Sequence, residues 1–202
     1  MLWKKKRKEI KLKNKNLEQI SFETQNEFKK WIEINHDKSE GIWLRFFKKD
    51  SGIATVTHDE ALDEALCYGW IDGQLKKCDD KSWLQKFTPR RSKSIWSKRN
   101  ADRAVELIKL KRMKPAGLKE IENAKSDGRW EKAYESPKDM TIPEDFLKRL
   151  SKDKKSQKFF ETLNRANKYA ISWRLQTAKK PETREKRMIN ILEMLSKEEK
   201  FH

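Results

Sequence analysis

The segment TPRRSKSIWSKRN, residues 88–100, carries the residue types best suited to bind an anion. Its cations are Arg90, Arg91, Lys93, Lys98 and Arg99, and it contains no acid. Guanidinium groups bind carboxylates and phosphates through paired hydrogen bonds, and Trp96 offers a ring face for stacking or cation–π contact. A helix that starts near Ser94 or Ser97 would add unpaired backbone N–H groups. We therefore predict an anion-binding site in this segment.

A purely structural interpretation of the same segment stays open. Here Ser94 caps the following helix and Trp96 packs in the core. The cations are then solvated, or they pair with acidic residues earlier in the chain.

Asp72, in the stretch WIDGQ, is the acid with the clearest functional alternative. An Asp before Gly is commonly a turn former. The functional alternative is that Asp72 holds an arginine of TPRR in a charge-assisted pair, beside Tyr68 and Trp70. An enzyme on this plan would clamp a small anionic substrate with arginines and use Asp72 or Glu64 as acid or base.

Other catalytic constellations are missing from the sequence. Cys67 lies on an apolar helical stretch beside acids, which raise a thiol pKa, so we predict a buried structural cysteine. The internal histidines, His36 and His58, are isolated, and the spacing predicts no metal site. Helix-dipole considerations disfavour protonation of His58. No Gly-rich phosphate loop occurs, and we predict no cofactor.

Composition predicts a folded chain despite its charge. Of 202 residues, 40% are charged, and the net charge is +17. Eight tryptophans and nine phenylalanines nevertheless provide material for a core. The basic residues concentrate in residues 1–16, 74–114 and 147–190, whereas residues 17–73 are acidic. This asymmetry favours polyanionic or oppositely charged partners.

The N-terminal half predicts a small mixed sheet with helices. EQISF, GIWLRFF, WIDGQLKKC and SWLQKFT are typical of strands, and IATVT is expected to pair back onto GIWLRFF. Thr24 is expected to cap one helix, and Thr57 with Glu60 to form a capping box on the next, HDEALDEALCY, before Gly69. A longer helix after Pro89 is expected to bury a face formed by Ala101, Ala104, Val105 and Ile108.

The C-terminal half predicts mainly helices. Pro115, Pro143 and Pro181 each stand where a helix can begin. The fold class is therefore α+β, a small mixed sheet with helices followed by a mostly helical half. We predict a basic, mobile tail at 1–16, an α+β core at 17–135 and a helical region at 136–202 packed on that core, with a single domain overall as the alternative.

Four motifs in fixed order resemble a known family. They are EALCYGWIDG (64–73), KFTPRRSKSIWSKRNADR (86–103), RMKPAGL (112–118) and AKSDGRW (124–130). The series resembles the YdeI/OmpD-associated family of bacterial proteins, called bacteriocin-protection proteins. ANKYAISWRLQTAKKPETREKRM (166–188) is similar to that family's closing helices, so the resemblance covers roughly residues 18–196. It implies a role in envelope stress or bacteriocin protection, and it transfers no reaction, cofactor or catalytic residue.

Two classes of function remain open on sequence. The favoured one is a non-enzymatic, basic cytoplasmic protein of the stress- or bacteriocin-protection type, which binds an unidentified anionic ligand or protein partner through the Arg90–Arg99 segment. The cytoplasmic expectation rests on two cysteines without a disulfide framework, no secretory signal and no apolar run of membrane-spanning length. The alternatives are the enzyme outlined above and a weak, non-specific nucleic-acid binder.

Overall fold

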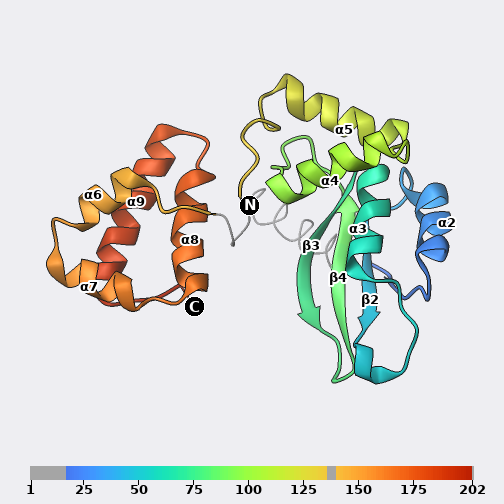
Figure 1. Cartoon of the computed structure of the whole chain (residues 1–202), viewed down its shortest axis with the longest axis horizontal. Coiled ribbons are helices and arrows are strands. Elements are labelled where there is room, and N and C mark those ends of the chain that lie inside the picture. Colours follow the sequence, from blue (N-terminus) through green and yellow to red (C-terminus); the bar gives the residue numbers. More distant parts are fainter. Residues whose placement is uncertain (1–16, 136–139, 202) are drawn as a thin grey trace, which may run out of the picture. The chain divides into compact units, whose positions relative to one another are not determined.

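The computed structural model of the chain describes residues 17–135 and 140–201, and it has the predicted α+β class (Figure 1). These residues form two compact units. The first comprises residues up to Ser94 together with Asn100–Glu131, and the second comprises Ile95–Arg99 together with Lys132 onward. The predicted basic tail, 1–16, lies outside the described residues. The predicted boundary at 135/136 stays a prediction.

A four-stranded mixed sheet organises the first unit. Its strands are β1 (Gln19–Ile20), β2 (Ile42–Phe47), β3 (Trp70–Lys77) and β4 (Ser82–Pro89), in the order β1-β2-β4-β3. β1 pairs with β2 in parallel, and the other two pairings are antiparallel. The strands predicted from EQISF, GIWLRFF, WIDGQLKKC and SWLQKFT are thereby confirmed.

Helices α2 (Gln25–Asn35) and α3 (His58–Cys67) begin where the sequence predicted. The Thr24 hydroxyl accepts from the Glu27 N–H, and Thr57 and Glu60 form the complete capping box. Such caps satisfy backbone N–H groups that the helix itself leaves unpaired. α3 ends before Gly69, whose φ of +74° lies in the left-handed region that glycine tolerates.

The core lies between these helices and one face of the sheet. Phe28 on α2 meets Phe87 on β4 edge to face at 6.0 Å, and Trp31 meets Trp70 in the same way at 5.9 Å. The Trp70 indole N–H also donates to the His36 carbonyl over 3.0 Å. Full burial of each large aromatic ring contributes about 1.5–3 kcal/mol, so these rings anchor the first unit.

A bulge interrupts the β3–β4 pairing at Gly73. Asp72 stands opposite Phe87 and Leu75 opposite Gln85, so two residues of β3 lie against one of β4. A bulge frees a ladder carbonyl, and here the Gln85 side chain donates to the Gly73 carbonyl over 2.8 Å. The buried Gln85 therefore stabilises the bulge.

The expected pairing of IATVT with β2 is wrong. The turn contains a short 3-10 helix, η1 (Lys49–Ser51), and the residues after it are not a strand. β1 and β4 already occupy both edges of β2. The Val56 N–H instead donates to the Phe22 carbonyl over 2.9 Å, which leads the chain into α3.

Helices α4 (Lys98–Lys109) and α5 (Pro115–Ser126) follow the sheet. The buried face of α4 is Asn100, Ala101, Ala104 and Leu107, whereas Val105 and Ile108 are each 39% exposed, so the predicted face was only half right. The actual face lets Arg103 reach α3. α5 approaches α3 closely at Gly117, where a Cβ atom would lie 2.4 Å from the Cys67 carbonyl oxygen.

The second unit contains four further helices, α6 (Glu144–Leu150), α7 (Lys154–Thr162), α8 (Arg165–Gln176) and α9 (Pro181–Ser196). Its buried core is formed by Phe146, Leu150, Phe160, Leu163, Ile171, Leu175, Met188, Ile191 and Leu195. Two bidentate ion pairs, Arg184 with Asp145 and Arg149 with Glu185, tie α9 to α6. The described part of this unit is therefore built mainly from packed helices.

Candidate functional site

Two of the predicted site residues line one pocket in the first unit. The pocket, of about 330 Å³, is bounded by Ile71, Asp72, Gly73, Gln74, Lys86, Thr88, Pro89, Arg91 and Ser94. It therefore lies where the β3 bulge meets the end of β4 and the turn beyond it. Its cationic groups are Lys86 and Arg91, and Asp72 is its acid.

A short turn after β4 places Arg91 at this pocket. The Arg91 N–H donates to the Ser94 hydroxyl over 3.0 Å, and the Ser94 N–H donates back to the Arg91 carbonyl over 2.8 Å. Arg129, itself paired with Asp127, donates to the Ser94 carbonyl over 2.8 Å. Ser94 is thus part of a turn rather than the predicted helix cap, and α4 begins only at Lys98.

Asp72 is paired with a histidine. His58 Nε2 lies 3.3 Å from Asp72 Oδ2, and His58 Nδ1 lies 3.6 Å from Asp59 Oδ1. The functional alternative in which Asp72 holds an arginine of TPRR stays a prediction. Asp72 is directly opposite Phe87 on the sheet face that packs against α3, and His58 opens α3 above that point.

The environment of His58 favours its charged form. The hydrogen bond to Asp72 raises the pKa of His58 above 6.5, against the opposing effect of burial, and Asp59 adds to the rise. The Phe46 and Phe87 rings lie at 6.1 and 6.2 Å from the imidazole. The helix-dipole expectation for His58 is overridden here, because a carboxylate at hydrogen-bonding distance outweighs a partial charge.

The other predicted cations occupy different settings. Arg90 is buried, with 7% of its surface exposed, and its backbone N–H donates to the Gly69 carbonyl over 2.9 Å. Lys93 is exposed in the turn but does not line the pocket. Lys98 and Arg99, in the first turn of α4, are exposed and belong to the second unit.

The aromatic candidates are core residues. Trp70 is fully buried, Trp96 is 1% exposed and Tyr68 is 5% exposed. Burial, with the nearby Glu33, raises the pKa of Tyr68 to about 12. The prediction that Trp96 packs in the core is confirmed. A ligand in the described pocket therefore meets none of these three rings.

A network of acids and arginines between α3 and α4 escaped sequence analysis. Arg103 Nε donates to Asp63 Oδ1 in a very short contact, and Arg112 donates to Asp63 over 3.3 Å and to Glu64 over 2.7 Å. Gln25 adds a 2.7 Å bond to the same Glu64 oxygen. The side chains of Asp63 and Glu64 are only 11% and 5% exposed. The signal in the sequence was two adjacent acids inside an otherwise apolar helix.

The arginines of this network are held in their charged form. The hydrogen bond to Asp63 raises the pKa of Arg103. Burial lowers the pKa of Arg112, but Glu64 and Asp63 more than offset that effect and the pKa rises. Glu64 and Arg112 also line a pocket of about 510 Å³ with Thr24, Gln25, Asn26, Lys29 and Glu60. Glu64, the other acid considered for catalysis, does not line the pocket of Arg91.

Cys67 has the structural character predicted for it. Its side chain is buried, and burial together with Glu64 raises the pKa of the thiol to about 12. A thiol with this pKa is a poor nucleophile at neutral pH. Within residues 17–135 and 140–201, no three His, Cys, Asp or Glu side chains gather in a way that could hold a metal ion.

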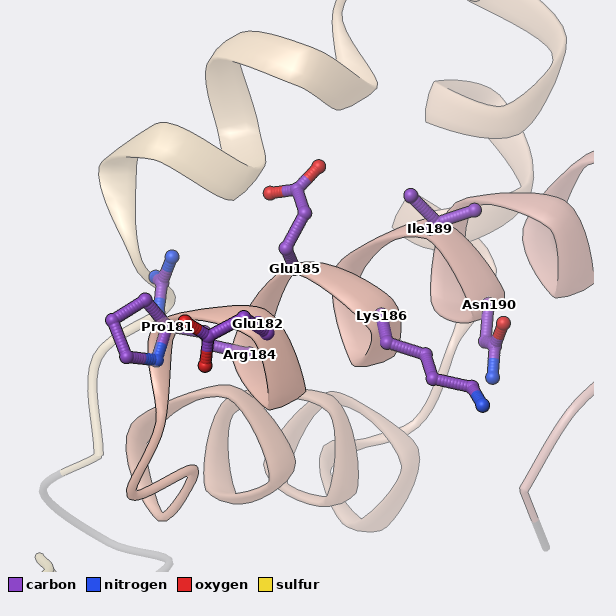
Figure 2. A pocket seen from close by; sticks show the side chains of 7 residues that line it. All are labelled: Pro181, Glu182, Arg184, Glu185, Lys186, Ile189 and Asn190. Atoms are coloured by element: carbon purple, nitrogen blue, oxygen red, sulfur yellow. The ribbon is translucent and has the colours of Figure 1, made fainter.

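A further pocket of about 710 Å³ lies along α9 in the second unit (Figure 2). It is lined by Pro181, Glu182, Arg184, Glu185, Lys186, Ile189 and Asn190. Two of its charged groups, Arg184 and Glu185, already form the bidentate pairs with α6. This pocket therefore offers fewer available charges than its residue types suggest.

Comparison with known families divides the chain much as the structure does. Residues 20–120 match a family described as Domain of unknown function (DUF8412); this is half of the chain, and the chain belongs to that family. Residues 139–198 match the family described as Bacteriocin-protection, YdeI or OmpD-Associated. No curated protein and no solved structure matches the chain.

The predicted resemblance is thus confirmed, and its match lies over α6 to α9. This match shows a YdeI/OmpD-associated, bacteriocin-protection domain at residues 139–198. Three of the four motifs that first suggested the resemblance lie within the DUF8412 match instead. Among the described helices, none is long and apolar enough to cross a membrane.

Proposed function

We propose that this chain is a non-enzymatic protection protein of the cytoplasm that binds an anionic ligand at the pocket containing Arg91. The protection role follows the family match of the C-terminal helices. The cytoplasmic assignment is supported by two unbridged cysteines, of which Cys78 is exposed, because exposed thiols persist in reducing compartments.

One observation carries the ligand assignment. The Arg91 guanidinium is exposed, forms no ion pair within the described part of the chain, and lines a pocket with Lys86. Hydroxyl groups of Thr88 and Ser94 line the same pocket and can donate hydrogen bonds to an oxyanion. The acid of the pocket, Asp72, is engaged by His58, whose raised pKa favours a compensating positive charge.

Pyrophosphate, titrated calorimetrically at 0.15 M salt, tests the anion site. Arg91→Glu is expected to weaken binding at least tenfold, since the change removes a bidentate donor and adds a repulsive charge. Lys93→Glu is the matched control, because it reverses an exposed charge two residues away that does not line the pocket. We expect less than a threefold effect from it, because Lys93 does not line the pocket and salt weakens the interactions of exposed charges. Equal binding by Arg91→Glu and the unaltered chain would contradict the proposal.

An enzyme acting on a small anionic substrate is the second candidate. It is favoured by one specific feature: Asp72, which His58 orients, is among the residues that line the pocket of Arg91, and an oriented carboxylate can act as a general base. The variant Asp72→Asn distinguishes a binding protein from an enzyme. A binding protein keeps its pyrophosphate affinity within a few fold in this variant and turns over no phosphate ester. An enzyme hydrolyses such an ester and loses at least 100-fold of its rate in the variant.

A further inference from the structure

The sheet of the first unit has one buried face and one half-exposed face. On β2, Ile42, Leu44 and Phe46 are buried, whereas the residues between them are only partly covered. The strand pairing extends this alternation across the sheet, because residues directly opposite one another share a face. The half-exposed face carries Trp43, Arg45 and Phe47 of β2, Lys86 of β4 and Lys76 of β3, which we term the cationic sheet face.

Cations and aromatic rings alternate on the cationic sheet face. Lys76 Nζ lies 4.0 Å from the centroid of the Trp43 ring, and Lys86 Nζ lies 6.0 Å from it. Arg45 Cζ lies 4.7 Å from the centroid of Phe47. Trp43 therefore presents an electron-rich ring that at present attracts two lysines.

Lys76 reaches Trp43 by crossing an intervening strand. It stands opposite Leu84 on β4, while Trp43 is on β2 at the far side of β4. Its aliphatic stem thus covers Leu84, which is only 2% exposed although it belongs to the half-exposed face. A flexible lysine stem, unlike a packed helix, can move aside when a flat group stacks on the tryptophan.

The cationic sheet face is continuous with the pocket of Arg91. Lys86 belongs to both, and Thr88 and Ile71, which pair across β4 and β3, line the pocket. Cations therefore follow one another from Arg91 through Lys86 and Lys76 to Arg45. Arg45, at the far end of this row, is also paired with Asp79.

We propose that this surface binds single-stranded nucleic acid, with phosphates along Arg91, Lys86 and Lys76 and a base stacked on Trp43. The inference rests on the proposed anion site and extends it. A compact anion needs only the pocket, whereas a row of cations along a sheet suits a chain of phosphates, and the partly exposed indole ring of Trp43 suits an unpaired base. Duplex DNA offers the phosphates but no unstacked base.

A fluorescein-labelled 15-nucleotide oligothymidylate, followed by fluorescence anisotropy with the full chain, tests this inference. Trp43→Leu is expected to weaken binding about tenfold, within the range known for a base stacked on an aromatic side chain. Lys76→Ala is expected to weaken it severalfold and to flatten the salt dependence, because one phosphate contact is lost.

The chain offers a matched control for both variants. Lys125 on α5 and Trp130 just after it form a second cation–tryptophan pair, away from the sheet. Lys125 Nζ lies 5.6 Å from the centroid of the half-buried Trp130 ring. Trp130→Leu and Lys125→Ala should each leave the oligothymidylate affinity within twofold. Circular dichroism of all four variants establishes that each is folded.

Several outcomes overturn the inference while leaving the anion site in place. The first is that the chain does not bind oligothymidylate. The second is that Trp43→Leu and Trp130→Leu weaken the binding equally. The third is that a duplex or poly-glutamate of equal length binds with the same affinity as oligothymidylate. In these cases Arg91-dependent pyrophosphate binding still supports the proposed function. Loss of the Arg91 dependence for both pyrophosphate and oligothymidylate overturns the two together.

Discussion

The first unit contains two arrangements of arginines and acids that differ in how fully their charges are paired. In the network that joins α3 to α4 and the residues after it, three ion pairs connect Arg103 and Arg112 with Asp63 and Glu64, and both acids are nearly inaccessible. At the pocket beyond β4, Arg91 is exposed and Asp72 is engaged by His58. The same residue types thus hold helices together in one place and leave a cation available in the other. Pairing, rather than the residue type, separates structural charges from binding charges.

Removing an acid from the paired network should have the largest effect on stability. Glu64→Ala leaves Arg112 partly buried beside a single carboxylate and should lower the free energy of unfolding by about 3 kcal/mol. Urea unfolding measures the loss. The control is Glu106→Ala, which breaks the exposed Lys109–Glu106 pair and should cost no more than about 0.5 kcal/mol. Similar losses in the two variants would show that burial of the network contributes nothing.

The His58–Asp72 pair should make a smaller, pH-dependent contribution to the free energy of unfolding. Because the pKa of His58 is raised in the folded chain, the pair stabilises most below the unfolded pKa of about 6.5, and this contribution is lost as pH rises through the folded pKa. Asp72→Asn should therefore destabilise by about 1 kcal/mol at pH 6, a change of about 2–4 °C in Tm, and by much less at pH 9. Thermal unfolding at both values checks this. A destabilisation that is constant from pH 6 to 9 would argue against a charged pair.

Truncation of the available cation should have the smallest effect on stability. Arg91→Ala removes a guanidinium without an ion-pair partner in the described residues, so the free energy of unfolding should change by less than about 0.5 kcal/mol. Arg103→Ala, its counterpart in the paired network, should destabilise clearly because Asp63 stays buried. The difference in pairing between the two arrangements of charges predicts that ordering of stabilities in a single urea series. The reverse ordering would mean that Arg91 has a structural role.

Local signals accounted for most of the elements of the fold. The capping box of Thr57 and Glu60, the caps at Thr24 and Gly69, and the aromatic strand of β2 were all predictable, because each depends on neighbours within a few residues. The buried face of α4 was harder to predict. Val105 and Ile108 are apolar and correctly spaced, but α4 is turned toward α3 through Arg103. The predicted pairing of IATVT with β2 was wrong for a related reason. The strand-like composition of this stretch cannot show that both edges of β2 are occupied.

The candidate site was predictable in part. Sequence analysis selected Arg91 and Asp72, which line one pocket, but it also selected Arg90, Tyr68, Trp70 and Trp96, which are buried. The residue types were therefore informative, and their accessibility was not.

By itself, the sequence determined the class of the fold, the starts of α2 and α3, the four strands of the sheet, the cationic segment and the relationship to the bacteriocin-protection family. These depend on local backbone preferences, side-chain periodicity and motif order. Only the tertiary structure decided which charges are paired, because an ion pair such as Arg112 with Glu64 joins residues 48 positions apart. The energy of a charge depends on its burial and on its nearest partners in space, and neither follows from its position in the chain.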